Sequence, residues 1–274
     1  MSRTVVIRCS AGVLALLGAW AAYTQNPQGK QGPPQLNLSK VKDNLYMIEG
    51  DASGNVGVFV TSEGVILVDD KFERDFDAVM AQVKSVTAQP VKYVLNTHQH
   101  GDHTGSNAKL LPTAEIIAHK NARANMEKSK QPGLMRIVFS EETSVFLGGQ
   151  EVRARYYGRG HTNGDVVIYF PALRTVHTGD LFVNSAPGDK HDPVVDYNAG
   201  ASVGDWPGTL DGALALDFDT VIPGHGPLGK KEDVARFRDN MRTLATRMTG
   251  MVRDGKCRTK VESSYSHQSR KFLF

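Results

Sequence analysis

The sequence has few cysteines, no long apolar run and no excess of one charge. Cys9 and Cys257 are its two cysteines, and we expect Cys9 to be removed with an N-terminal signal, so an internal disulfide is excluded from the mature chain. The 32 basic and 29 acidic residues form no polybasic tract, which argues against nucleic acid as a partner. With 274 residues, 40% of them apolar, the chain suits one large globular domain or two small ones.

Residues 1–21 have the pattern of a secretory signal peptide. Arg3 and Arg8 precede a twelve-residue apolar run, 11–22, with Ala19 and Ala21 at an A-x-A cleavage site. Because about 20 apolar residues are needed to span a bilayer, we expect cleavage and no stable membrane insertion afterwards, with a retained anchor as the alternative. Cleavage would lower the net charge from +3 to +1, since both arginines leave. The predicted location is periplasmic or secreted.

The rest of the chain divides by composition. Residues 22–40, rich in Gln, Pro, Gly and Asn, predict a flexible leader, and residues 254–274, rich in Ser, Lys and Arg, predict a disordered tail. The folded domain is predicted over 41–253. Within it, short runs of β-branched and apolar residues predict strands near 44–49, 56–61, 64–69, 91–95, 145–147, 152–157, 166–170, 175–178 and 220–223.

Three helices are predicted, over 73–86, 206–216 and 231–252. In the first, Phe76, Val79, Met80 and Val83 follow the i, i+3, i+4, i+7 spacing of one buried face. Two β-rich halves with helices between and after them suggest a sandwich with helices on both outer faces.

A dense group of metal-binding residue types follows the predicted strand 91–95. The segment 97–103 reads Thr-His-Gln-His-Gly-Asp-His and holds four potential ligands, His98, His100, Asp102 and His103. Two histidines at i and i+2 of an extended segment lie on one side, so His98 and His100 can converge on one ion. Asp102 and His103 must then face another way, which favours a second ion about 3.5–4 Å from the first.

Three further candidates occur at the ends of apolar runs later in the chain. They are His161 in the segment 160–165, Asp180 in 177–180 and His225 in 223–226, and glycine flanks each of them. With the motif they make seven candidate metal ligands, of which Asp102 is also the candidate catalytic residue.

Other histidines have a simpler interpretation. A lone histidine is more often packed or solvated than a ligand, and we apply that interpretation to His119, His191 and His267. His177, on a predicted strand, is expected to pack or to hydrogen-bond a ligand. The same interpretation fails for the motif, because unpaired buried imidazoles and carboxylates are costly.

The H-x-H-x-D-H motif, followed in order by His161, Asp180 and His225, resembles the metallo-β-lactamase superfamily over residues 41–253. The resemblance implies an α/β fold, the four-layer αβ/βα sandwich. It implies a first metal on His98, His100 and His161, a second on Asp102, His103 and His225, and Asp180 as the bridge. It also implies that Asp69 orients a ligand by hydrogen bonding, the alternative being a solvated strand end.

By this resemblance the chain is a binuclear zinc-dependent hydrolase. A metal-bridging hydroxide would attack an ester, thioester, lactone or β-lactam-type bond of a small-molecule substrate. The all-nitrogen-and-oxygen ligand set favours two Zn²⁺ ions, although iron or manganese can occupy such a set. His100 argues against the di-iron branch, in which glutamate usually replaces that histidine.

Three alternatives stay open. A sulfur dioxygenase of the persulfide-oxidising branch would hold one iron on His98, His161 and Asp180. A dedicated class B β-lactamase typically has cysteine or serine where this chain has Asp180, so Asp180 favours the thioesterase, lactonase and phosphodiesterase branches. The third alternative is a metal-binding relative without catalytic activity.

Overall fold

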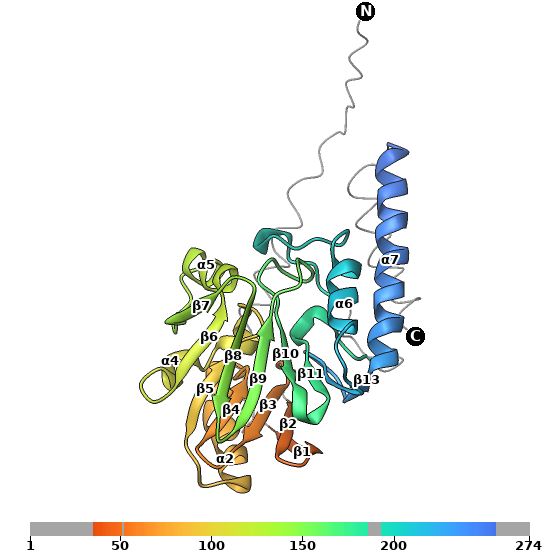
Figure 1. Cartoon of the computed structure of the whole chain (residues 1–274). Helices are drawn as coiled ribbons and strands as arrows, with labels where there is room; N and C mark the ends of the chain where they lie inside the picture. The colour runs from red at the N-terminus through yellow and green to blue at the C-terminus, as the bar shows by residue number, and fades with distance from the viewer. Residues whose placement is uncertain (1–34, 51, 186–192, 256–274) are drawn as a thin grey trace, which may run out of the picture.

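The computed structural model describes residues 35–50, 52–185 and 193–255 (Figure 1). The predicted signal peptide, 1–21, lies outside the described residues, as do His191, His267 and nearly all of the predicted tail. Within the described ranges, no helix combines the length and the apolar character needed to cross a bilayer.

The strands form two sheets. The first sheet has seven strands in sequence order, antiparallel from β1 to β4 and parallel from β4 to β7. Its strands are β1 (Leu36–Lys42), β2 (Leu45–Gly50), β3 (Val56–Val60), β4 (Val65–Val68), β5 (Val91–Leu95), β6 (Glu115–His119) and β7 (Ile137–Phe139).

The second sheet has six strands in the order β13-β12-β11-β10-β9-β8, in which only β11 and β12 are parallel. Its strands are β8 (Glu142–Leu147), β9 (Gln150–Arg155), β10 (Val167–Phe170), β11 (Thr175–His177), β12 (Thr220–Ile222) and β13 (Gly229–Lys230).

Helices lie on the two outer faces. The α-helices are α2 (Phe76–Val86), α3 (Gly101–Thr104), α4 (Asn107–Leu110), α5 (Lys120–Lys128), α6 (Trp206–Leu214) and α7 (Lys231–Arg253). Short 3-10 helices are η1 (Glu73–Asp75), η2 (Pro171–Leu173), η3 (Gly179–Leu181) and η4 (Tyr197–Ala199). In Figure 1, α6 and α7 cover the second sheet on the opposite side from α2, α4 and α5.

Three apolar cores separate these layers. One core packs α2, α4 and α5 on the first sheet, a second fills the space between the sheets, and a third packs α6 and α7 on the second sheet. Strand β4 shows why both faces bury apolar groups: Val65 and Leu67 enter the first core, whereas Ile66 and Val68 enter the middle one. The four-layer αβ/βα fold predicted for the chain is therefore confirmed.

The strands at the start and in the middle of the chain differ most from the prediction. The predicted leader, 22–40, is wrong for residues 36–40, which belong to β1. Leu36 is buried in the first core and pairs with Gly50 of β2, a long-range contact that local composition does not reveal. The pair β6 and β7, with α5 between them, was also not predicted, because both strands are short and pair in parallel with strands distant in sequence.

The ends of the parallel strands position the polar residues. Strands β4 and β5 are parallel, and so are β11 and β12, so their carboxyl ends meet at one edge of the sandwich. Asp69 follows β4, His98 follows β5, Asp180 follows β11 and His225 follows β12.

Candidate metal centre

All seven candidate ligands lie together at this edge, in two groups. Within each group the ligand atoms lie within 4.8 Å of one another: one group is His98, His100, His161 and Asp180, and the other is Asp102, His103 and His225. The motif supplies both groups because the backbone changes conformation inside it. His100 is extended, whereas α3 begins at Gly101 and turns Asp102 and His103 away from the two earlier histidines.

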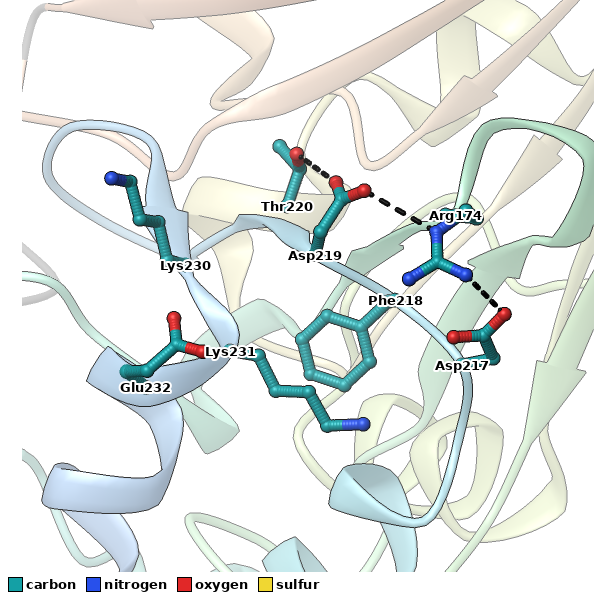
Figure 2. A pocket seen from close by; sticks show the side chains of 8 residues that line it. All are labelled: Arg174, Asp217, Phe218, Asp219, Thr220, Lys230, Lys231 and Glu232. Atoms are coloured by element: carbon teal, nitrogen blue, oxygen red, sulfur yellow. Dashed lines mark hydrogen bonds and ion pairs between the residues drawn. The ribbon is translucent and has the colours of Figure 1, made fainter.

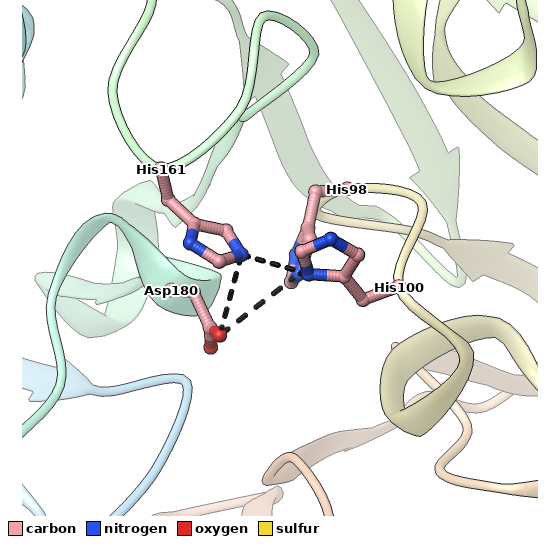
Figure 3. A group of neighbouring side chains, drawn as sticks. All are labelled: His98, His100, His161 and Asp180. Carbon is pink, nitrogen blue, oxygen red and sulfur yellow. Dashed lines mark hydrogen bonds and ion pairs between the residues drawn. The ribbon is translucent and has the colours of Figure 1, made fainter. Parts of the chain in front are cut away.

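The first group is a cluster of three imidazole rings beside one carboxylate. Nδ1 of His100 lies 3.2 Å from Nε2 of His98 and 2.8 Å from Nε2 of His161. Asp180 Oδ2 lies 4.0 Å from Nε2 of His98 and 3.6 Å from Nε2 of His161. Figure 3 shows the rings turned toward one another and toward Asp180.

The second group contains one carboxylate of its own. Asp102 Oδ2 lies 3.5 Å from Nε2 of His103 and 3.3 Å from Nε2 of His225. The other oxygen of Asp180, Oδ1, lies 3.3 Å from Nε2 of His103 and 3.4 Å from Nε2 of His225. Asp180 therefore presents one oxygen to each group.

The donor atoms fit a pair of metal ions. Tetrahedral zinc with ligands at about 2.0–2.1 Å places neighbouring ligand atoms about 3.3 Å apart, and the distances in the two groups range from 2.8 to 4.0 Å. His103 Nε2 and Asp180 Oδ1 are buried and make no hydrogen bond, although they lie 3.3 Å apart. Buried polar atoms without hydrogen bonds are costly, so their orientation toward one point is explained by a cation.

The second nitrogens of four rings are held by acceptors outside the cluster, as in metal sites. Nε2 of His100 lies 2.9 Å from Asp196 Oδ2, and Nδ1 of His161 lies 2.6 Å from the Val194 carbonyl oxygen. Nδ1 of His103 lies 2.8 Å from Asp69 Oδ2, and Nδ1 of His98 lies 3.1 Å from Thr97 Oγ1. These contacts leave the inward nitrogens directed at the centre.

Two aspartates contact ligand rings from outside the groups, and the sequence predicted Asp69 but not Asp196. Asp69 is fully buried and accepts hydrogen bonds from the backbone and hydroxyl of Thr97 as well as facing His103, so it is not a solvated strand end. Asp196 was not predicted. It precedes η4 and accepts hydrogen bonds from two backbone N–H groups of that helix. Its contact with His100 joins two segments that are far apart in the sequence.

The surroundings shift the pKa values of the rings in different directions. Burial opposes protonation of His100, but the hydrogen bond to Asp196 raises its pKa. Burial lowers the pKa of His98 well below its ordinary value, and burial likewise lowers the pKa of His161. In the second group burial opposes protonation, but the Asp180 and Asp102 carboxylates raise the pKa of His225 to about 9. Burial would also raise the pKa of Asp102, but His103 and His225 hold that pKa at about 2.

Of the described histidines, His177 and His119 lie outside the two ligand groups and have structural roles. Burial lowers the pKa of His177 to about 4, and the neutral ring lies 3.2 Å from the Asn55 carbonyl oxygen and accepts a hydrogen bond from Gly179 N–H. His119 caps α5 by accepting from Asn121 N–H and stacks on Tyr156. Neither belongs to a ligand group.

A surface pocket of about 550 Å³ lies at the other end of β11 and β12 (Figure 2). Arg174, before β11, contacts Asp217 and lies 3.3 Å from Asp219, before β12. The remaining lining residues are Phe218, Thr220, Lys230, Lys231 and Glu232. The carboxylates of Asp217 and Asp219 are paired with Arg174, and neither belongs to a ligand group. The candidate metal site is therefore the cluster at the opposite ends of these strands.

Known proteins resemble the chain in sequence and in fold. The sequence pattern of the metallo-beta-lactamase superfamily matches residues 50–225. A metallo-beta-lactamase type 2 of Bacillus cereus is 28% identical, over 76% of this chain and 81% of its own length. The alpha subunit of 2,4-dinitroanisole O-demethylase of Nocardioides sp. (strain JS1661) is 26% identical, over 84% of this chain and 67% of its own length.

Solved structures agree on the fold. A metallo-beta-lactamase from Pontibacter korlensis superposes with a TM-score of 0.66 at 21% identity, covering 76% of this chain and 99% of its own. The DIM-1 metallo-beta-lactamase superposes with a TM-score of 0.65 at 21% identity, covering 77% of this chain and 98% of its own. Fold, clustered ligands and sequence matches together define a metal-dependent hydrolase. The chain belongs to the metallo-beta-lactamase superfamily.

Proposed function

We propose that the chain is a binuclear zinc hydrolase that cleaves an ester, thioester, lactone or β-lactam-type bond. The observation that carries the proposal is the position of Asp180, whose Oδ2 faces His98 and His161 and whose Oδ1 faces His103 and His225. A carboxylate with one oxygen toward each of two ligand groups is suited to hold two cations close together.

The side chains would divide the work as follows. The two ligand groups would hold two zinc ions, which when bound would supply a water of lowered pKa as nucleophile and polarise the bond that is cleaved. Asp102 is 15% exposed, so its carboxylate reaches the surface of the cluster, and its pKa of about 2 keeps it ionised at neutral pH. It can accept a proton from the attacking water and return it to the leaving group.

The choice of zinc rests on the donor set. Five imidazoles and two carboxylates offer nitrogen and oxygen only, which suits zinc, whereas iron is the alternative that a sulfur dioxygenase would use. The second group argues for two ions, because one iron on His98, His161 and Asp180 would leave Asp102, His103 and His225 without a function.

A class B β-lactamase is the second candidate, because the Bacillus cereus relative is named a metallo-beta-lactamase. The demethylase relative is named for a different substrate, an aryl methyl ether, although its identity to this chain is similar. The resemblance of Asp180 to the bridging aspartate of thioesterases and lactonases favours the broader hydrolase. We further propose that the enzyme acts outside the cytoplasm, on the basis of the signal pattern in residues 1–21.

Metal analysis and a substrate panel test the proposal. The purified chain should contain two zinc ions and hydrolyse a member of a panel of lactone, thioester, phosphodiester and cephalosporin substrates. Chelation should abolish that activity, and zinc should restore it. The matched control is His119→Asn, which changes a histidine outside the cluster and keeps an acceptor for the α5 cap. One iron with oxygen consumption on a persulfide would overturn the hydrolase proposal.

A further inference from the structure

The turn Ser53–Asn55, between β2 and β3, lies between the two segments that carry the second ligand group. Gly54 N–H donates to the Asp102 carbonyl at 3.2 Å, and Asn55 N–H donates to the Gly224 carbonyl at 2.7 Å. A Cβ on Gly54 would lie 2.3 Å from Cε1 of His103, so only glycine allows this approach. The turn therefore contacts the backbone on both sides of the group.

The Asn55 side chain extends this link to the residues on either side of His225. It is 2% exposed, and its Nδ2 donates to the Pro223 carbonyl at 3.0 Å and to the Gly226 carbonyl at 2.8 Å. Asn55 precedes a strand of the first sheet, whereas His225 follows β12 of the second sheet. These bonds hence fix the position of His225 relative to Asp102 and His103.

The turn is itself held by a buried lysine. Lys71 is fully buried, and its Nζ donates to the Gly54 carbonyl at 2.8 Å, the Ser53 hydroxyl at 3.2 Å and the Gly50 carbonyl at 3.1 Å. Lys71 lies two residues after Asp69, the acceptor of His103. The support of the second group is thus continuous from β4 to the His225 turn.

The first group has different supports. The outward nitrogens of His98, His100 and His161 face Thr97, Asp196 and the Val194 carbonyl. None of the hydrogen bonds described for Asn55 reaches these three histidines. A change at Asn55 should therefore act on one of the two groups.

We propose that Asn55 is a positioning residue for the second metal ion. Its hydrogen bonds hold the turn that carries His225 next to the segment that carries Asp102 and His103. The inference rests on the proposed binuclear function. Asparagine suits the position because its amide directs two N–H donors at two carbonyls. Alanine removes both donors, and serine keeps one on a side chain too short to reach both.

Cobalt titration of the metal-free full chain tests the inference. Wild type should bind two equivalents of Co²⁺, with a visible absorption change for each. Asn55→Ala should bind the first equivalent within about twofold of wild type and the second about 10- to 100-fold more weakly, the range typical of changes behind metal ligands. Asn55→Ser should likewise weaken only the second equivalent. If the alanine variant does not fold, the serine variant tests the inference.

Asn44→Ala is the matched control. Asn44 Nδ2 donates to the Val60 carbonyl at the far end of β3, so this change removes a similar amide bond away from the cluster. It should leave both equivalents unchanged. Wild-type affinity for the second equivalent in both Asn55 variants, or equal weakening of the two equivalents, would overturn the inference alone. A wild-type chain that binds a single equivalent would overturn the binuclear function, and the inference with it.

Discussion

The two ligand groups are built from the same kinds of parts but are held by different regions. Each takes two side chains from the motif 98–103 and one histidine from the second half of the chain, and Asp180 faces both. The supports of the first group include the loop of Val194 and Asp196, where Val194 is 48% exposed. The second group is supported by the buried residues Asp69 and Asn55.

The rings also differ in their pKa values. In the first group, burial lowers the pKa values of His98 and His161, so these rings are neutral and ready to bind a cation. In the second, burial is outweighed by the Asp102 and Asp180 carboxylates, which raise the pKa of His103 well above its ordinary value. His100 of the first group differs from its two neighbours, because the hydrogen bond to Asp196 and the nearby carboxylates raise its pKa despite burial. The carboxylates beside each ring therefore decide which histidines are protonated before a cation enters.

Replacing Asp180 should reduce activity more than any other single change, because Asp180 is the one ligand candidate that faces both groups. Asp180→Ala leaves both groups without a carboxylate oxygen, so we expect kcat/KM to fall by about a thousandfold, the upper range for loss of a group that stabilises charge in the transition state. Steady-state kinetics on the best substrate of the panel and metal analysis measure this. Asp219→Asn, an exposed aspartate, is the control and should stay within about twofold. Full turnover with two bound metals in Asp180→Ala would contradict the bridging role.

Removing one imidazole from each group should separate them. His161→Ala should retain one metal in the second group, and His225→Ala should retain one in the first. Turnover should fall by more than about a hundredfold in both, beyond the range expected for residues behind the ligands. Asp102→Ala should behave like His225→Ala. Wild-type turnover in His225→Ala or Asp102→Ala would refute the two-metal assignment.

The acceptors behind the rings should give smaller, selective effects. Asp196→Ala should weaken binding of the first metal by about 10- to 100-fold. Asp69→Ala should weaken binding of the second metal by a similar factor and of the first metal less, because Asp69 reaches His98 only through Thr97. Because Asp69 is fully buried and also binds Thr97, its loss should lower the melting temperature more than the loss of Asp196. Metal competition titrations and thermal unfolding measure both. Equal effects of each variant on both metals would show that the groups are not separately supported.

His177 should make the stability of the metal-free chain depend on pH without affecting either group directly. Its pKa is lowered by burial to about 4, against about 6.5 in the unfolded chain. Between these two pH values the unfolded state binds a proton that the folded state does not. The stability that neutral His177 contributes is therefore complete above pH 6.5 and is lost as the pH falls toward 4, by up to about 3 kcal/mol. Urea unfolding of wild type and His177→Gln should show a shallower pH dependence in the variant. Identical pH dependence would contradict this.

Much of the secondary structure was predictable, because the local pattern of apolar residues indicates most of the helices and strands. The apolar run of strand β10 and the amphipathic helix α2 are each recognisable within ten or so residues. Strands β1, β6 and β7 were missed, since β1 is stabilised by pairing with β2 and the other two by parallel neighbours distant in sequence. Short strands carry too little local signal to be distinguished from loops.

The sequence by itself determined which side chains gather at the metal centre, because four of them occupy one motif and the others end apolar strands beside glycine. Only the tertiary structure decided how the cluster divides and what holds each part. Asp196 lies 96 residues from the His100 ring that it contacts, and Asn55 lies 171 residues from the Gly226 carbonyl to which it donates. Lys71 lies 17 residues from Gly54, whose carbonyl it binds. A hydrogen bond depends on distance and direction in space, and neither is encoded in the residues that flank its donor.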